Sequence, residues 1–192
     1  MQKRRRLRPE QSKALIFEAA ERLIASQGAA SLTVRGIAAE AGMNPSLVRY
    51  YYESTEDLLI AFFRQMAEEH SRKVEEALCA PHPLRALWNL HTRAPSGLLT
   101  MEIMSLGHRY ESIREELVRH MDAVRKHVSR ALQDKLSGEA SCFGTNSPSG
   151  AAFIFLATAA ALIADRGIGI HSGNAQAEEI VECWLDKVES AM

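Results

Sequence analysis

Cysteine is scarce in this sequence, with three residues among 192, and the three are far apart. Cys79, Cys142 and Cys183 include no C-x-x-C pair, which argues against a disulfide framework, a zinc site or a dithiol redox motif. His120 and His127 are seven residues apart, roughly 10 Å along a helix and too far for one metal ion. We therefore expect no metal, no cofactor and a reducing, cytoplasmic environment.

Long hydrophobic runs are also few. The longest covers residues 151–164, and its 14 residues fall short of the roughly 20 that span a bilayer. The charged start of the chain, MQKRRRLRPEQ, is not followed by the apolar stretch of a secretory signal. The sequence therefore predicts no membrane segment, and we interpret residues 151–164 as a buried helix.

The strict alternation of apolar and polar residues that marks a β-strand is absent. The six prolines and eleven glycines gather in a few short stretches, and between them apolar residues recur at steps of three and four. This pattern indicates an all-α fold of about nine helices. We expect these helices over residues 11–26, 34–41, 45–51, 55–78, 84–92, 98–106, 112–136, 151–165 and 175–190.

Charge is unevenly distributed, although the whole chain carries a net charge of only −1. Residues 1–55 hold nine lysines and arginines against five acidic residues, so the rest of the chain is acidic. A basic head on an acidic body is typical of a nucleic-acid-binding module joined to a module of another kind. We therefore expect two domains, residues 1–54 and residues 55–192.

The stretch from Thr33 to Asp57 contains a series of helix start and stop signals. The Thr33 hydroxyl is suited to cap one short helix, and Gly42 permits the tight turn that ends it. Asn44 followed by Pro45 is a capping residue followed by a first-turn proline, and residues 54–57 (Ser-Thr-Glu-Asp) read as a capping box for a long helix. Two short helices joined by a glycine-containing turn indicate a helix-turn-helix, whose second helix can enter a major groove. The apolar anchors expected on this second helix and just after it are Leu47, Val48 and Tyr51 or Tyr52.

The region from residue 14 to residue 61 resembles the tetracycline-repressor (TetR) family of regulators. The matching segments are ALIFEAAERLIASQG (14–28), SLTVRGIAAEAGMNPSLVRYYYES (31–54) and EDLLIAF (56–62). They combine a stop glycine, the Thr-Val-Arg-x-Ile-Ala start, the Ala-Gly turn and an aromatic pair before the long helix. The remaining residues match the family only in length, helix number and helix order.

The resemblance implies a set of DNA contacts. A basic arm adds electrostatic attraction, two residues at the start of the second helix hold phosphates, and the third helix faces the bases and the backbone. In this sequence those residues are Arg4, Arg5, Arg6, Thr33, Arg35, Asn44, Pro45, Ser46, Arg49, Tyr50 and Tyr51. Two positions depart from the family pattern. Thr55 replaces a phosphate-binding lysine, and Gly36 replaces an acidic residue that often completes the cap of the second helix.

For the C-terminal body, the resemblance implies a homodimer built by the last two helices and a small-molecule site among the middle ones. Residues 151–165 are apolar on nearly all sides, and residues 175–190 add an apolar stripe, as a four-helix bundle between two subunits requires. Methionines and aromatics on the middle helices suit a hydrophobic effector. The expected effector contacts are Phe62, Met66, His70, Trp88, His91, Met101, Met104, His108 and Met121.

These features predict a dimeric transcription regulator that binds a double-stranded, palindromic DNA operator and releases it when an effector binds. Repression is the expected outcome, and activation remains open. One alternative is a helical dimeric adaptor that binds no DNA. Another is a helical enzyme with a cysteine nucleophile and a histidine base, but no nucleophile motif or paired-carboxylate signature supports it. We therefore expect no catalytic residues.

Overall fold

The computed structural model describes residues 8–93, 97–133 and 147–190, and within these ranges every regular element is a helix. The predicted all-α class is therefore confirmed. The elements are α1 (Pro9–Gln27), the 3₁₀ turn η1 (Ala29–Ser31), α2 (Val34–Glu40), α3 (Pro45–Tyr51), α4 (Thr55–Leu78), α5 (Pro83–Thr92), α6 (Gly97–Arg109), α7 (Glu111–Gln133), α8 (Pro148–Ile168) and α9 (Asn174–Ser190).

Packing groups the chain into two compact units. The first unit comprises residues 1–66 and 99–116, and the second comprises residues 67–98 and 117–192. Three helices, α4, α6 and α7, therefore contribute residues to both units. The functional division after residue 54 stays a prediction, because it concerns which residues bind DNA and not which residues pack together.

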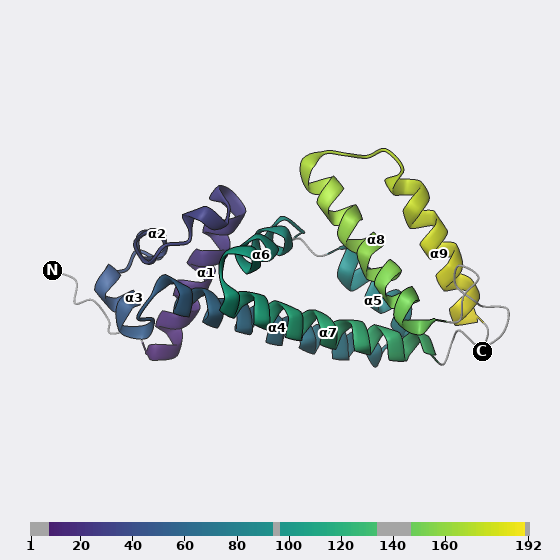
Figure 1. Ribbon diagram of the computed structural model, residues 1–192, viewed down its shortest axis with the longest axis horizontal. Helices are drawn as coiled ribbons and strands as arrows, with labels where there is room; N and C mark the ends of the chain where they lie inside the picture. Colours follow the sequence, from purple (N-terminus) through teal and green to yellow (C-terminus); the bar gives the residue numbers. More distant parts are fainter. Residues whose placement is uncertain (1–7, 94–96, 134–146, 191–192) are drawn as a thin grey trace. The chain divides into compact units, whose positions relative to one another are not determined.

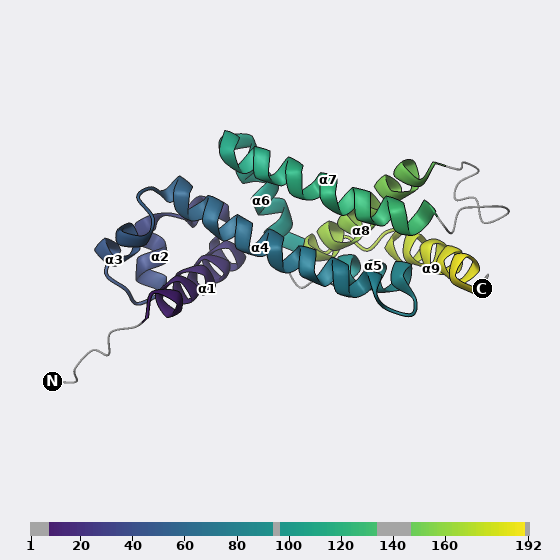
Figure 2. The same ribbon diagram turned by 90° about the horizontal axis from the view of Figure 1, so that it is seen from below.

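The first unit is built around a three-helix head of α1, α2 and α3, which group together in both ribbon views (Figures 1 and 2). Ile16, Ile37 and Val48, one from each helix, are fully buried in its core. The Phe17 ring lies 5.9 Å from that of Tyr52 and 5.7 Å from that of Phe62, so the start of α4 closes the same core. The head therefore has its own hydrophobic centre, which holds α3 by one face.

The first unit also includes parts of α6 and α7, which are joined to the head by polar contacts. The Glu102 carboxylate on α6 accepts a hydrogen bond of 2.8 Å from the backbone N–H of Ala29, where η1 begins. On α7, the buried Glu116 accepts one of 2.7 Å from the Arg64 side chain of α4. These contacts tie the end of α1 to α6 and the first half of α4 to the start of α7.

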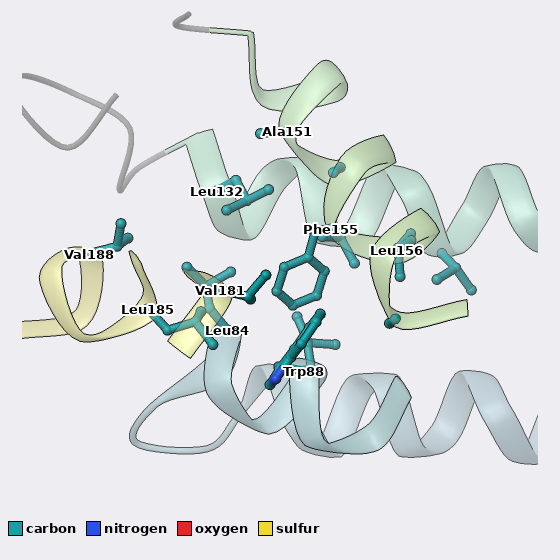
Figure 3. Close-up of a cluster of buried hydrophobic side chains, with 14 of the residues drawn as sticks. Leu84, Trp88, Leu132, Ala151, Phe155, Leu156, Val181, Leu185 and Val188 are labelled. Carbon is teal, nitrogen blue, oxygen red and sulfur yellow. The ribbon is translucent and has the colours of Figure 1, made fainter. Parts of the chain in front are cut away.

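The second unit has a core of its own where α5, α7, α8 and α9 meet. Figure 3 shows the Trp88 ring of α5 facing the Phe155 ring of α8, with Leu185 of α9 beside them. The Trp88 and Phe155 ring centroids are 5.2 Å apart, and both side chains are buried. A carboxylate reinforces this core, because the buried Glu189 accepts the backbone N–H of Leu84 at 2.8 Å and so caps the start of α5.

Helix α8 is longer than the sequence pattern indicated. It begins at Pro148, because the Ser147 hydroxyl caps it by accepting the Gly150 N–H, and it ends where Gly169 takes a left-handed conformation with φ +82°. Its 21 residues make it long and apolar enough, by length and composition alone, to cross a membrane. The 14-residue apolar run in the sequence is thus shorter than the 21-residue helix that contains it. One side of α8 packs against α5 and α9 in the core.

Gly36 occupies a position with no room for a side chain. A Cβ atom built there lies 2.9 Å from the backbone oxygen of Ser31 and 3.1 Å from the Thr33 hydroxyl. In the family pattern, an acidic residue at this position often completes the cap of α2. In the structure the Thr33 hydroxyl caps the helix by accepting the Gly36 N–H at 3.0 Å, and the close approach gives a reason for glycine.

We predict that Gly36→Ala destabilises the head by about 1 kcal/mol. Alanine favours a helix over glycine by about 1 kcal/mol, but the overpacked Cβ meets a backbone atom and costs about 1–3 kcal/mol. Urea unfolding followed by circular dichroism measures the difference. A variant as stable as the parent, or more stable, contradicts the steric explanation.

Candidate functional site

The α3 helix is presented at the surface of the head by local interactions. The Asn44 side chain accepts the Ser46 N–H at 2.9 Å, Pro45 fills the first helical position, and Gly42 makes the preceding turn with φ +63°. Val48 is the one fully buried residue of the helix. The caps predicted at Thr33 and Asn44 are thus confirmed, as is the capping box of residues 54–57, where Asp57 and Ser54 bond to each other reciprocally.

The outer side of α3 is polar, aromatic and open. Asn44, Pro45, Ser46 and Arg49 are exposed, and the Tyr50 side chain is 79% exposed. Tyr51 is half-buried, with its ring centroid 5.2 Å from that of Tyr50 in an edge-to-face arrangement. A short helix held by one buried residue and exposed along its other sides is suited to enter a groove.

A shallow hollow of about 420 Å³ lies between the start of α2 and the start of α4. The residues that line it are Thr33, Val34, Arg35, Arg49, Glu53, Ser54 and Thr55. Arg35 and Arg49, from different helices, thus share one surface with two helix starts. Cationic side chains beside exposed backbone N–H groups favour anions such as phosphate. Thr55 itself is half-buried and carries no charge. This chain therefore has no cation at the position where the TetR pattern has a phosphate-binding lysine.

Most of the predicted DNA-contact residues lie on α2, on α3 or at the residues that cap these helices, and most of them are exposed to solvent. Arg4, Arg5 and Arg6 lie outside the described residues. The prediction for Leu47 was wrong: it was expected to anchor α3 to the core, but its side chain is 37% exposed, because Val48 alone faces inward. In a helix this short, periodicity cannot distinguish two adjacent apolar residues. The DNA contacts themselves remain a prediction.

The second unit contains a cluster of three histidines, one each from α4, α5 and α7. The ring centroid of His70 lies 5.2 Å from that of His91 and 5.1 Å from that of His120. The Nδ1 atom of His70 and the Nε2 atom of His120 are 3.0 Å apart, at hydrogen-bond distance. We call His70, His91 and His120 the histidine trio. His70 and His91 were among the predicted effector contacts, whereas the sequence gave no reason to single out His120 for this role.

Burial keeps the histidine trio uncharged near neutral pH. It lowers the pKa of His70 to about 4, helped by the repulsion that a proton there would meet from His91, His120 and Lys73. Burial also lowers the pKa of His91, against the hydrogen bond to Leu87, and it lowers the pKa of His120 with a contribution from His91. Three adjacent imidazoles in a partly buried site therefore favour neutral forms.

The histidine trio makes stability depend on pH. In the unfolded chain His70 accepts a proton below its ordinary pKa of 6.5, whereas in the folded protein it does so only near pH 4. The free energy of unfolding is therefore unaffected above pH 6.5 and falls as the pH drops from 6.5 towards 4, by about 3 kcal/mol from this group. Urea unfolding at pH 7, 6 and 5 measures the slope. We expect His70→Gln to flatten it and His127→Gln, seven residues after His120 on α7, to leave it unchanged.

The other predicted effector contacts are divided between the units. In the first unit, Phe62 is buried against Phe17, whereas Met101, Met104 and His108 are exposed on α6. In the second, Trp88 is fully buried and Met121 half-buried, and Met66 is the last residue that α4 contributes to the first unit. Among residues 8–93, 97–133 and 147–190, no group of histidine, cysteine and acidic side chains is arranged to hold a metal ion.

Two of the three cysteines can be placed. Cys79 and Cys183 are exposed and free, and Cys142 lies outside the described residues.

Comparison with known proteins extends these observations. Residues 16–62 match the family model for bacterial regulatory proteins of the tetR family. Over 60 residues, 31% of this chain, the sequence is 42% identical to the HTH-type transcriptional regulator BetI of Rhizobium meliloti. That match spans 29% of the BetI chain, so the chain is similar to the curated relatives over about a third of their length.

Solved structures match along almost the whole chain. A TetR transcription regulator from Haloarcula marismortui has a TM-score of 0.75 and 18% identity, covering 92% of this chain and 97% of its own. A transcriptional regulator from Saccharomonospora viridis, solved in complex with choline, has a TM-score of 0.76 and 18% identity, covering 95% and 97%. At this identity the similarity establishes a shared all-α fold, including the helices beyond residue 62.

Proposed function

We propose that the chain is an effector-responsive transcription regulator of the TetR type, because residues 16–62 match the model of that family and the solved structures share its fold. In this proposal it binds a palindromic DNA operator as a homodimer, represses transcription, and releases the operator when a small molecule binds. The observation that carries the proposal is the α3 helix, which is held by the buried Val48 and exposes Asn44, Ser46 and Arg49.

The α3 residues have side chains suited to read base edges. An arginine can bond a guanine and an asparagine an adenine, although the Asn44 oxygen already caps α3. We propose that Arg49 carries the base-specific contact and that Arg35 and the tyrosines hold phosphates. The exposed Leu47 supplies an apolar contact of the kind that recognises a thymine methyl group. The arm at residues 4–6 adds non-specific attraction.

The faces of α8 and α9 that point away from the core support the proposed homodimer. On α8, Phe153 is 54% exposed and Ile168 is 68% exposed, and Ala157, Ala160 and Ala161 lie exposed between them. On α9, Ile180 is 63% exposed. An apolar stripe with small residues at its centre lets a second helix pair approach closely, which favours a second copy of the chain as its partner. In this proposal the dimer is cytoplasmic.

The proposed effector response uses α4. This helix is continuous from Thr55 to Leu78, and it carries both Phe62, in the core of the head, and His70, in the histidine trio. An effector bound near the middle helices moves the head only if it binds one arrangement of α4 more tightly than the other. Choline, which is bound in one similar structure, is a reasonable first compound to test.

The decisive experiment selects bound sequences from random double-stranded DNA with the full-length protein. We expect an enriched palindrome, because a two-fold dimer presents α3 twice, at half-sites about one helical turn apart or a multiple of it. Enrichment of no sequence over the input supports the remaining alternative, a dimeric adaptor that binds no DNA. A non-palindromic product contradicts the dimeric arrangement.

A further inference from the structure

The second unit holds an unsatisfied hydrogen-bond acceptor within the histidine trio. His91 Nδ1 lies 2.8 Å from the backbone oxygen of Leu87, one turn earlier in α5. A carbonyl oxygen can only accept, so Nδ1 carries the proton and Nε2 is left with a lone pair. That Nε2 atom is buried and has no hydrogen-bond partner among the described residues. A buried acceptor without a donor is destabilising, so this atom favours any ligand that supplies one.

The two neighbouring imidazoles are already engaged with each other. His70 Nδ1 and His120 Nε2 face each other at 3.0 Å, so one N–H of the pair is used inside the cluster. The second N–H of the neutral pair lies on His70 Nε2 or on His120 Nδ1, whereas His91 Nε2 presents a lone pair, which repels an anion. Burial and the nearby Lys73 both oppose protonation of His70. The uncharged trio therefore offers an anion no positive charge, and the trio atom without a partner among the described residues, His91 Nε2, accepts a hydrogen bond.

We propose that the histidine trio binds the polar end of the effector, and that this end is a hydrogen-bond donor, a hydroxyl or an amine, and not a carboxylate or a phosphate. This inference rests on the proposed function, because it names the chemistry of the effector. Val74 on α4, four residues after His70, and Leu87 and Trp88 on α5, three and four residues before His91, are buried core residues on the same helices as the trio, and the buried Trp88 Nε1–H has no partner among the described residues. The effector is then a mainly apolar molecule with one donor group.

The test uses three small probes that share one ring and differ in one group: benzyl alcohol, benzylamine and benzoate. Each is added at millimolar concentration to the full-length protein without DNA, and the histidine side-chain nitrogens are followed by ¹⁵N NMR. We expect benzyl alcohol, benzylamine or both to shift the His91 Nε2 resonance and to raise the melting temperature, and benzoate to do neither. Stronger binding of benzoate, equal responses to all three, or no shift from any of them overturns the proposal.

Two variants locate the response. His91→Phe removes the acceptor and keeps a ring, and we expect the response to the alcohol and the amine to weaken at least tenfold. His127→Phe, outside the trio, is the matched control and retains the response. If His91→Phe does not fold, the comparison of probes with the unaltered protein still decides the matter. An undiminished response in a folded His91→Phe variant overturns the proposal.

A negative result of the probe-binding experiment can be distinguished from failure of the proposed regulator function. Probe binding is measured without DNA, and operator selection without probes. If the protein selects a palindrome but binds benzoate best, the proposed regulator function is supported and the proposal of a donor-bearing effector is contradicted. If the protein responds to benzyl alcohol or benzylamine but selects no DNA, the binding site at the histidine trio is supported and the regulator function is contradicted.

Discussion

Replacing Ala160 by aspartate is expected to convert the protein into a monomer that no longer binds its operator tightly. Ala160 lies at the centre of the exposed α8 stripe, between Phe153 and Ile168. In the proposed dimer the new carboxylate is buried without a partner, and two-fold symmetry introduces it twice. An uncompensated buried charge costs several kcal/mol, so dimer affinity should fall by about a thousandfold or more.

Light scattering coupled to size-exclusion chromatography measures the oligomeric state, and titration of labelled operator measures the loss of DNA affinity. Ala123→Asp is the matched control, because Ala123 is exposed within α7 and the change carries the same charge and a similar helix-propensity cost. The control should remain a dimer with normal binding. A dimeric Ala160→Asp protein with full operator affinity is the result that excludes this face as the interface.

Removing the two arginines of the hollow is expected to have the second large effect. Arg35 and Arg49 come from α2 and α3 and line the same surface, so the variant Arg35→Ala/Arg49→Ala deletes both cations without touching the buried core. If each contributes about 1–3 kcal/mol, the pair lowers operator affinity by about thirtyfold or more per subunit. The dimer should remain intact.

The salt dependence of binding identifies the role of each arginine. Loss of a phosphate contact reduces the steepness of log affinity against log salt concentration by about one. Loss of a base contact instead relaxes the sequence preference at one position of the operator. We expect Arg35→Ala to reduce the slope and Arg49→Ala to broaden the selected sequence. Lys126→Ala/Arg130→Ala removes two exposed cations from α7 and serves as the control for net charge. Equal losses from the control and the test variant mean that α2 and α3 do not contact the DNA.

The two experiments also separate the regulator from the adaptor alternative. An adaptor that dimerises through α8 and α9 loses its oligomeric state in Ala160→Asp, but it shows no specific DNA affinity for the arginine variants to change. A regulator loses DNA affinity in both variants and loses dimerisation in only one. The pattern across both variants is therefore more informative than either result alone.

Much of the head was predictable because its signals are local. Thr33 caps α2 and Asn44 caps α3 through N–H groups two or three residues away, and the capping box of Ser54 and Asp57 is equally short in range. Such contacts need only the sequence window in which they stand. Leu47 shows the limit of local reasoning, since only the packing of the head decided that its neighbour Val48 turns inward.

By itself, the sequence determined the helices, their order, the caps of the head and the match of residues 16–62 to a family of regulators, because periodicity and capping act between residues less than two turns apart. Tertiary structure alone decided that His70 meets His120, 50 residues later, that Gly36 lies against the Ser31 backbone, and which side of α8 stays uncovered. These outcomes depend on how separate helices pack, and an apolar residue or a histidine has the same sequence signature whichever neighbour it meets.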